Sequence, residues 1–213
     1  MEKVKKVLDR IFIEGLSAMA QGLFATLIIG TIIQQIGSFI PGQAGTILFV
    51  IGKVAASLTG AGIGVAVAYK FNESPLVVVS AATAGMTGAF ASKLLAGTVL
   101  VDGAMVYSGP GEPLGAFLAA YVGIYFGHLV SGKTKVDILV TPIISIGTGS
   151  AVGLILGPPI SGFMVWLGSV INWGTEQQPF LMGIIVSVLM GMILTLPISS
   201  AALGIILNLS GLA

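Results

Sequence analysis

The 213-residue sequence has no cysteine, one histidine and very little charge, and each scarcity excludes a class of protein. Without cysteine there is no disulfide, no thiolate metal site and no cysteine nucleophile or phospho-acceptor. A single histidine excludes a histidine-rich metal centre, and we expect no metal or other cofactor. Charged residues make up only 8% of the chain, against about 25% in soluble domains. The net charge of +1 also argues against nucleic acid as a partner.

Apolar residues and glycine take the place of the missing charge. The apolar set makes up 55% of the chain, there are 31 glycines, and the mean hydropathy is +1.07. A water-facing surface cannot be built from this composition. The sequence therefore predicts a polytopic membrane protein, with the lipid bilayer as its surroundings.

Apolar runs long enough to cross a bilayer, which takes about 20 residues, divide the chain at its charges and prolines. The sequence predicts spans at residues 16–40, 44–69, 75–101, 114–130, 137–156 and 180–196, with a loop at 102–113. Residues 160–173, after Gly157-Pro158-Pro159, suit a short tilted span or a re-entrant half-helix. Apolar sequence continues from Pro197 to Ala213, which predicts a broken helix there or a natural chain that extends past residue 213. The expected fold is all-α: one integral-membrane domain over residues 1–213, a bundle of about 6–8 spans with broken or re-entrant helices.

The few positive charges predict the orientation. Seven of the nine fall on one side of the expected spans: Lys3, Lys5, Lys6, Arg10, Lys70, Lys133 and Lys135. Loops with excess Lys and Arg stay cytoplasmic, so we expect a multi-pass protein of the cell membrane with a cytoplasmic N-terminus. Residues 1–15 form either a helix lying on the cytoplasmic interface or a solvated leader.

Small residues recur every four positions in two of the expected spans. One series is Gly115, Ala119, Gly123, Gly127 and Ser131, and the other is Ala18, Gly22, Thr26 and Gly30. Membrane helices associate closely through such small-residue ridges. The span at 114–130 is therefore expected to pack tightly against a neighbour along its whole length.

Three ionisable residues lie within expected spans. Lys53 and Lys93 either snorkel to the interface or join an internal ion pair, or else they line an anion or substrate pathway. His128, near the cytoplasmic end of its span, is expected to be a hydrogen-bonding residue at the interface, with a proton relay as the alternative.

Polar residues concentrate in one segment between apolar stretches, residues 172–179. It brings Asn172, Trp173, Thr175 and Glu176 together, and an indole beside a carboxylate and amides suits a sugar. The alternative is an ordinary interfacial loop with an aromatic belt residue. No phosphate-binding loop, metalloprotease motif or nucleophile elbow occurs, and no nucleophile and base pair is visible. We therefore expect no catalysis by this chain alone.

Three stretches, at residues 130–142, 172–183 and 194–202, resemble one membrane family. They are similar to the EIIC membrane component of the bacterial phosphotransferase system, in the type-2 branch that includes toxin-regulator membrane proteins of the perfringolysin-regulator type. The resemblance implies a homodimeric sugar permease that binds its substrate at membrane depth, while a cytoplasmic EIIB protein donates a phosphoryl group. EIIC branches contain a Gly-Ile-Thr-Glu-like motif whose glutamate contacts the sugar. Gly174-Thr175-Glu176 is similar but lacks the isoleucine.

Two functions follow as alternatives. The first is a phosphotransferase-system sugar permease, with Glu176, Trp173, Asn172 and Thr175 as sugar contacts and the 133–135 loop near EIIB. The second is a membrane sensor or regulator on a transporter-derived fold. A small-solute channel is a third reading, which rests on the glycine-rich packing alone.

Overall fold

A computed structural model describes residues 9–101, 103–107, 109–177, 180–181, 183–185 and 187–188, with the backbone alone at 167, 168 and 170–177. Nearly all of these residues are helical, which confirms the all-α membrane bundle. The helical elements are η1 (Arg10–Gly15), α2 (Leu16–Leu23), η2 (Phe24–Ile28), α3 (Ile29–Phe39), α4 (Gln43–Ser57), α5 (Thr59–Lys70), α6 (Pro75–Ala89), α7 (Ala91–Leu95), α8 (Pro113–Val130) and α9 (Asp137–Gln177).

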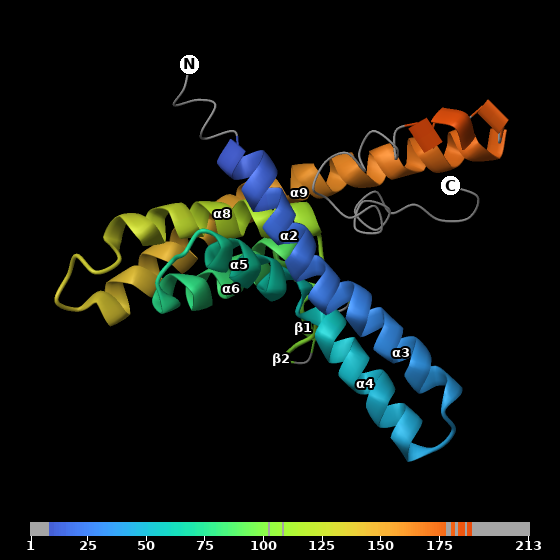
Figure 1. Cartoon of the computed structure of the whole chain (residues 1–213), viewed down its shortest axis with the longest axis horizontal. Helices are drawn as coiled ribbons and strands as arrows, with labels where there is room; N and C mark the ends of the chain where they lie inside the picture. The colour runs from blue at the N-terminus through green and yellow to red at the C-terminus, as the bar shows by residue number, and fades with distance from the viewer. Residues whose placement is uncertain are drawn as a thin grey trace.

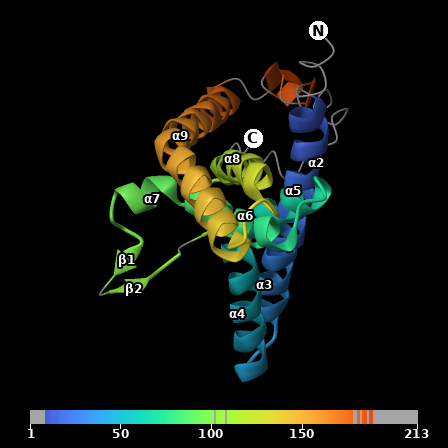
Figure 2. The ribbon, with the colours of Figure 1, turned by 90° about the vertical axis from the view of Figure 1, so that its left-hand side faces the viewer.

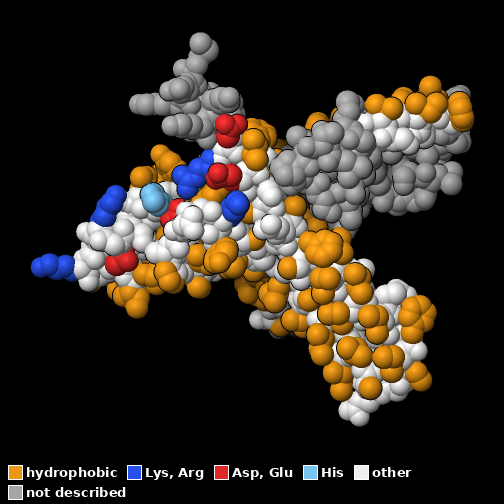
Figure 3. Space-filling view, in the orientation of Figure 1, with side chains coloured by type: hydrophobic (Ala, Val, Ile, Leu, Met, Phe, Trp, Pro, Cys, Tyr) orange, Lys and Arg blue, Asp and Glu red, His pale blue; other side chains and the backbone are white. Residues whose placement is uncertain are grey.

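Helices α5, α6, α8 and the first half of α9 lie against one another and form the body of the molecule (Figures 1 and 2). The hairpin α3–α4 projects from this body in one direction and the second half of α9 in another. Apolar side chains cover the outside of the α3–α4 hairpin (Figure 3). A surface of this kind is suited to lipid.

Three described helices are long and apolar enough to cross a membrane: Arg10–Phe39, Pro113–Val130 and Asp137–Trp166. The first joins η1, α2, η2 and α3 without interruption, so the part of the expected leader that is described runs directly into the first span. It ends at Phe39, after which Ile40 is extended. Gly42, which precedes α4, adopts a φ of 85°, a conformation that glycine reaches at no steric cost. The first and fourth expected spans are thereby confirmed.

The second expected span is a pair of helices, α4 and α5, bent by 54° at Leu58. If the pair is one span, the described part of the chain has up to four. The bend has a packing consequence, because α4 lies along α3 whereas α5 packs on α2 and α6.

The third expected span, 75–101, is wrong in its second half. Helix α6 ends at Ala89, α7 follows, and strands β1 (Leu100–Val101) and β2 (Ala104–Met105) form a small antiparallel hairpin, with Leu100 opposite Met105. Gly97 ends α7 in the left-handed region at φ 70°, and the amides of Gly97 and Thr98 donate to the carbonyls of Leu94 and Lys93. This is a helix C-terminus closed by glycine, which the apolar composition of residues 90–101 conceals.

The expected break at Gly157-Pro158-Pro159 is also wrong. Helix α9 is continuous from Asp137 to Gln177 and contains these prolines as well as Pro142. The separate span at 137–156 and the separate segment at 160–173 are therefore parts of one helix. Proline within a membrane helix is tolerated where neighbouring groups satisfy the carbonyls it frees. Gly157 contributes a close contact instead of a break, since a Cβ there would lie 2.7 Å from that of Ala91.

The predicted packing along α8 is confirmed. A Cβ at Gly115 would lie 2.7 Å from the carbonyl oxygen of Gly88 in α6, and one at Gly123 would lie 2.7 Å from that of Ser145 in α9. The ridge in the first span packs similarly, since Gly22 faces Gly62 and Gly30 faces Gly52. Only residues without a side chain allow these backbones to approach so closely.

Candidate functional site

A cavity of about 380 Å³ lies where α6 and α7 meet the loop before α8 and the middle of α9. Its polar lining comes from Ser92 and Lys93 of α7, Glu112 at the start of α8, and Ser161 of α9. Met164, Val165, Ala89 and backbone glycines supply the apolar wall. Residues far apart in the sequence thus bring one cation, one carboxylate and two hydroxyls to a single concave surface.

The local fold holds Glu112 in place. Its amide donates to the carbonyl of Ala89 at 2.7 Å, and its carboxylate accepts from the amide of Leu114 at 3.4 Å as the N-cap of α8. Burial raises the pKa of the Glu112 carboxyl above its ordinary value of 4.5, and the Leu114 hydrogen bond opposes this increase. A carboxyl with a raised pKa is a common feature of binding and proton-transfer sites.

Lys93 and Lys53, the two lysines within expected spans, line different cavities. The Lys93 ammonium lies 5.6 Å from the ring centroid of Phe90 and faces the cavity just described. Lys53 lines a second cavity of about 590 Å³ between the α3–α4 hairpin and residues 106–107 and 109–110, together with Thr31, Gln34, Ser57 and Tyr107. Each lysine therefore lines a cavity, and a role of either in a substrate pathway stays a prediction.

One short segment borders both cavities. Gly109 and Pro110 appear in the lining of each. Gly109 and Gly111 have φ angles of 82° and 74°, which residues other than glycine rarely adopt. The segment therefore forms a glycine-flanked partition between the Lys93–Glu112 cavity and the Lys53 cavity.

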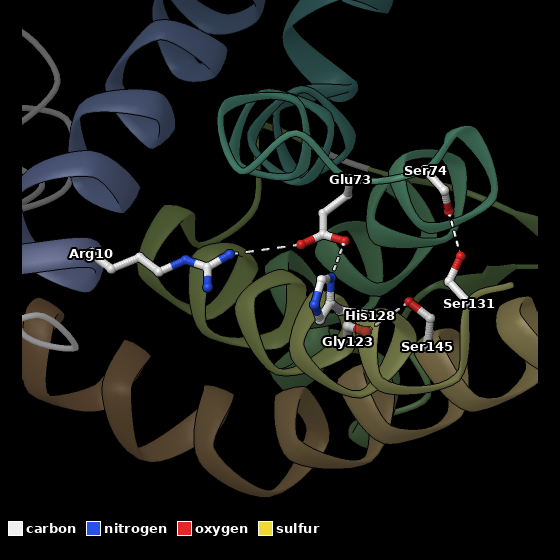
Figure 4. Close-up of polar contacts among 7 residues, drawn as sticks. All are labelled: Arg10, Glu73, Ser74, Gly123, His128, Ser131 and Ser145. Atoms are coloured by element: carbon white, nitrogen blue, oxygen red, sulfur yellow. Dashed lines mark hydrogen bonds and ion pairs between the residues drawn. The ribbon is translucent and has the colours of Figure 1, made fainter. Parts of the chain in front are cut away.

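A second polar cluster lies where α5 turns into α6 and α8 ends, whereas the Lys93–Glu112 cavity lies at the start of α8 (Figure 4). The Nδ1 atom of His128 lies 2.9 Å from Oε2 of Glu73, and the Arg10 guanidinium lies 3.7 Å from Oε1. Arg10 also stacks over Phe71, 4.4 Å from the ring centroid. Beside this cluster, Ser74 and Ser131 share a hydrogen bond of 2.8 Å.

His128 is therefore a hydrogen-bonding residue, as expected from its position, and its partner is an acid 55 residues away in the sequence. The sequence analysis assigned no role to Glu73. The sequence feature that could have pointed to Glu73 is its position as the single acid in the polar turn after α5. The side chain of Glu73 is only 3% exposed, against 65% for His128.

The remaining sequence-predicted site residues fall where side chains are not described. The last turns of α9 contain Asn172, Trp173, Thr175 and Glu176, of which the structure describes the backbone alone. Their contacts with a sugar stay a prediction. The expected span at 180–196 lies mostly outside the described residues. Within the part of the chain that the structure describes, no group of three or more His, Asp or Glu side chains is placed to hold a metal ion.

Apolar helices long enough to span a bilayer and close glycine ridges between them together define a helical membrane protein. Residues 13–213 match the family model "Phosphotransferase system, EIIC". The chain belongs to this family, and it is a membrane component of the phosphotransferase system in sugar transport, where EIIC domains work with EIIB components. A comparison with curated proteins found no match.

Proposed function

We propose that this chain is a sugar permease, which binds a carbohydrate in the membrane and presents it for phosphorylation by a cytoplasmic EIIB protein. The cavity that contains Lys93 and Glu112 carries the proposal. A sugar offers hydroxyls that both donate and accept, and this cavity supplies an ammonium donor, a carboxylate acceptor and two serine hydroxyls. Its volume of about 380 Å³ lies in the range of small-molecule sites.

The charge state of Glu112 suits this ligand. Burial favours the protonated carboxyl, which donates one hydrogen bond and accepts others, whereas the ionised form only accepts. The apolar wall formed by Met164 and Val165 complements the C–H face of a sugar ring.

Glu176 has a separate role in this proposal. It follows Ser161 by 15 residues on α9, which is about 22 Å along a helix. Binding at the Lys93–Glu112 cavity and binding near Glu176, Trp173, Asn172 and Thr175 are then different stages of one path. A carboxylate at the second stage can accept hydrogen bonds from the sugar hydroxyls.

Assembly and orientation complete the proposal. The chain acts as a homodimer, with its N-terminus and the 133–135 loop on the cytoplasmic side near EIIB. Support for the orientation comes from three exposed lysines: Lys70, the last residue of α5, and Lys133 and Lys135, in the loop after α8. Cysteines placed at Lys135 and Ala104 in this cysteine-free chain should react with impermeant reagents from opposite sides, and labelling of both from one side would overturn the orientation.

Sugar binding by the purified full chain tests the main proposal. A panel of neutral and acidic mono- and disaccharides should include at least one ligand that wild type binds. Glu112→Gln should alter its affinity, whereas Glu14→Gln, an exposed acid on η1, should not. Glu176→Gln should lower the affinity for that sugar, and equal binding by wild type and variant would remove Glu176 from the site. If no carbohydrate binds and none is phosphorylated, the permease proposal is wrong.

A further inference from the structure

The length of α4 predicts that Lys53 lies deep in the membrane. It follows Gln43, the first residue of α4, by ten positions, or about 15 Å at 1.5 Å per residue. The hydrocarbon core is about 30 Å thick, so a hairpin turn at one interface places Lys53 near the middle of the bilayer. A lysine stem reaches only part of that distance, and snorkelling to the interface therefore does not account for it.

Lys53 has no carboxylate within ion-pair distance among the described residues. Its ammonium lies 5.9 Å from the ring centroid of Phe49, one turn earlier on α4. An aromatic face compensates a cation only weakly, whereas a charge at the centre of a membrane is costly without a counter-charge. The position calls for an anion.

The cavity beside Lys53 is equipped for such a group. It measures about 590 Å³, and among the described residues that line it Lys53 is the one with a charge, while Thr31, Gln34, Ser57 and Tyr107 supply hydroxyls and an amide. Thr31, Gln34 and Ser57 donate hydrogen bonds to carbonyls of their own helices. These three side chains therefore already have hydrogen-bond acceptors, which leaves the Lys53 ammonium as the strongest attraction for an anion in this cavity.

The Lys53 cavity meets the Lys93–Glu112 cavity at Gly109 and Pro110. A ligand that spans this partition would place one end beside Glu112 and the other beside Lys53. The two ends differ in charge: of the lining residues that the structure describes, those of the first cavity include Glu112 and Lys93, and the charged one of the second is Lys53.

We propose that Lys53 binds the anionic group of an acidic carbohydrate, such as the carboxylate of a uronic acid, whose remaining hydroxyls are held at the Lys93–Glu112 cavity. The proposal rests on the permease function and names its substrate class. A lipid headgroup offers similar anionic chemistry, but headgroups lie at the interface, about 15 Å from the bilayer centre. In addition, Gly109 and Pro110 line both the Lys53 cavity and the Lys93–Glu112 cavity.

Binding measurements with acidic sugars and their neutral counterparts test this assignment. Wild type should prefer the acidic sugar of each pair, and Lys53→Gln should lose this preference, because the substitution removes the positive charge that pairs with the acidic group. Affinity for the neutral sugar should change little. Lys70→Gln is the matched control, because it removes a lysine that lines neither cavity.

The absence of native cysteine allows a test within one folded variant. Lys53→Cys should bind the acidic sugar weakly, and modification with an aminoethyl thiosulfonate, which restores a positive charge, should recover the affinity. A sulfonatoethyl reagent, which adds a negative charge, should weaken binding further. Equal effects of the two reagents would overturn a role for the lysine charge.

The source of the anion is distinguished by repeating the measurements in nanodiscs of phosphatidylcholine alone and with phosphatidylglycerol. Inhibition of acidic-sugar binding by phosphatidylglycerol in wild type, lost in Lys53→Gln, would reassign Lys53 to lipid and overturn the proposal. Binding of neutral sugars without preference for acidic ones would also overturn it, while leaving the permease function intact. Failure of every sugar to bind would contradict the permease function itself.

Discussion

The Nδ1 atom of His128 lies 2.9 Å from Oε2 of Glu73 and so ties the last turn of α8 to the turn between α5 and α6. Among the described residues, Oε1 of the same carboxylate accepts no hydrogen bond and lies 3.7 Å from the guanidinium of Arg10. One buried acid thus holds together the N-terminal helix and two elements of the body. Its two partners are substantially exposed.

Replacing Glu73 by alanine should destabilise the protein by about 1–3 kcal/mol, the typical cost of losing a hydrogen bond to a charged group. Glu73→Gln should cost less, because an amide still pairs with the imidazole. The measurement is thermal unfolding of purified protein in detergent, with the exposed Glu14→Ala as control. A double-mutant cycle with His128→Ala isolates the pair, and a coupling energy near zero would show that the contact does not contribute to stability.

Two glycines on α9 provide a matched test of helix packing. A Cβ at Gly149 would lie 2.6 Å from the carbonyl oxygen of Ala119, whereas a Cβ at Gly147 meets nothing within 4 Å. Gly149→Ala should therefore destabilise the protein by about 1–3 kcal/mol through overpacking. Gly147→Ala should be neutral or stabilising, because alanine favours a helix by about 1 kcal/mol over glycine. Equal unfolding temperatures for the two variants would contradict the close approach of α8 and α9.

A serine hydroxyl adds a polar contact at the same interface. Ser145 is fully buried and donates to the carbonyl of Gly123 in α8 at 2.9 Å. Such bonds between membrane helices average about 0.6 kcal/mol, so Ser145→Ala should lower the unfolding free energy by about that amount. Thr148→Val is the control, because Thr148 donates at 2.7 Å to Ile144 of its own helix. A smaller loss for Ser145→Ala than for Thr148→Val would contradict the interhelical role.

The part of the fold that the sequence predicted is the part set by local pattern. Apolar length located the spans at 16–40 and 114–130, and four-residue spacing located the ridge on α8. The end of α6 and the continuity of α9 could not be read this way. Residues 90–101 are as apolar as a span, and the prolines of α9 are accommodated by their surroundings in the folded protein.

The candidate site was less accessible from the sequence, because its residues meet only through the fold. The charge of Lys93 stands out within an apolar run, whereas Glu112 is one of several polar residues in the expected loop at 102–113. Glu73 and His128 are 55 positions apart, and no local pattern pairs them. Tertiary contacts of this kind depend on how helices cross, which the glycine ridges restrict but do not specify.

Glu112 makes the stability of the protein depend on pH in a defined direction. Burial raises the pKa of its carboxyl above 4.5 in the folded state, so the folded state favours the protonated form more than the unfolded state does. The resulting stabilisation is complete below pH 4.5, is lost as the pH rises through the folded-state pKa, and changes no further above it.

Glu112→Gln removes this titration while the amide oxygen can still accept from Leu114. The variant should unfold at nearly the wild-type temperature below pH 4.5 and at a higher temperature once the pH exceeds the pKa of Glu112 in the folded protein. Thermal unfolding of both proteins across this range, at constant ionic strength, gives the difference directly. A wild-type advantage that grows with pH would mean that the ionised carboxylate is stabilised in the fold. Lys93, which lines the same cavity, would then be the first partner to test, by repeating the comparison in a Lys93→Gln background.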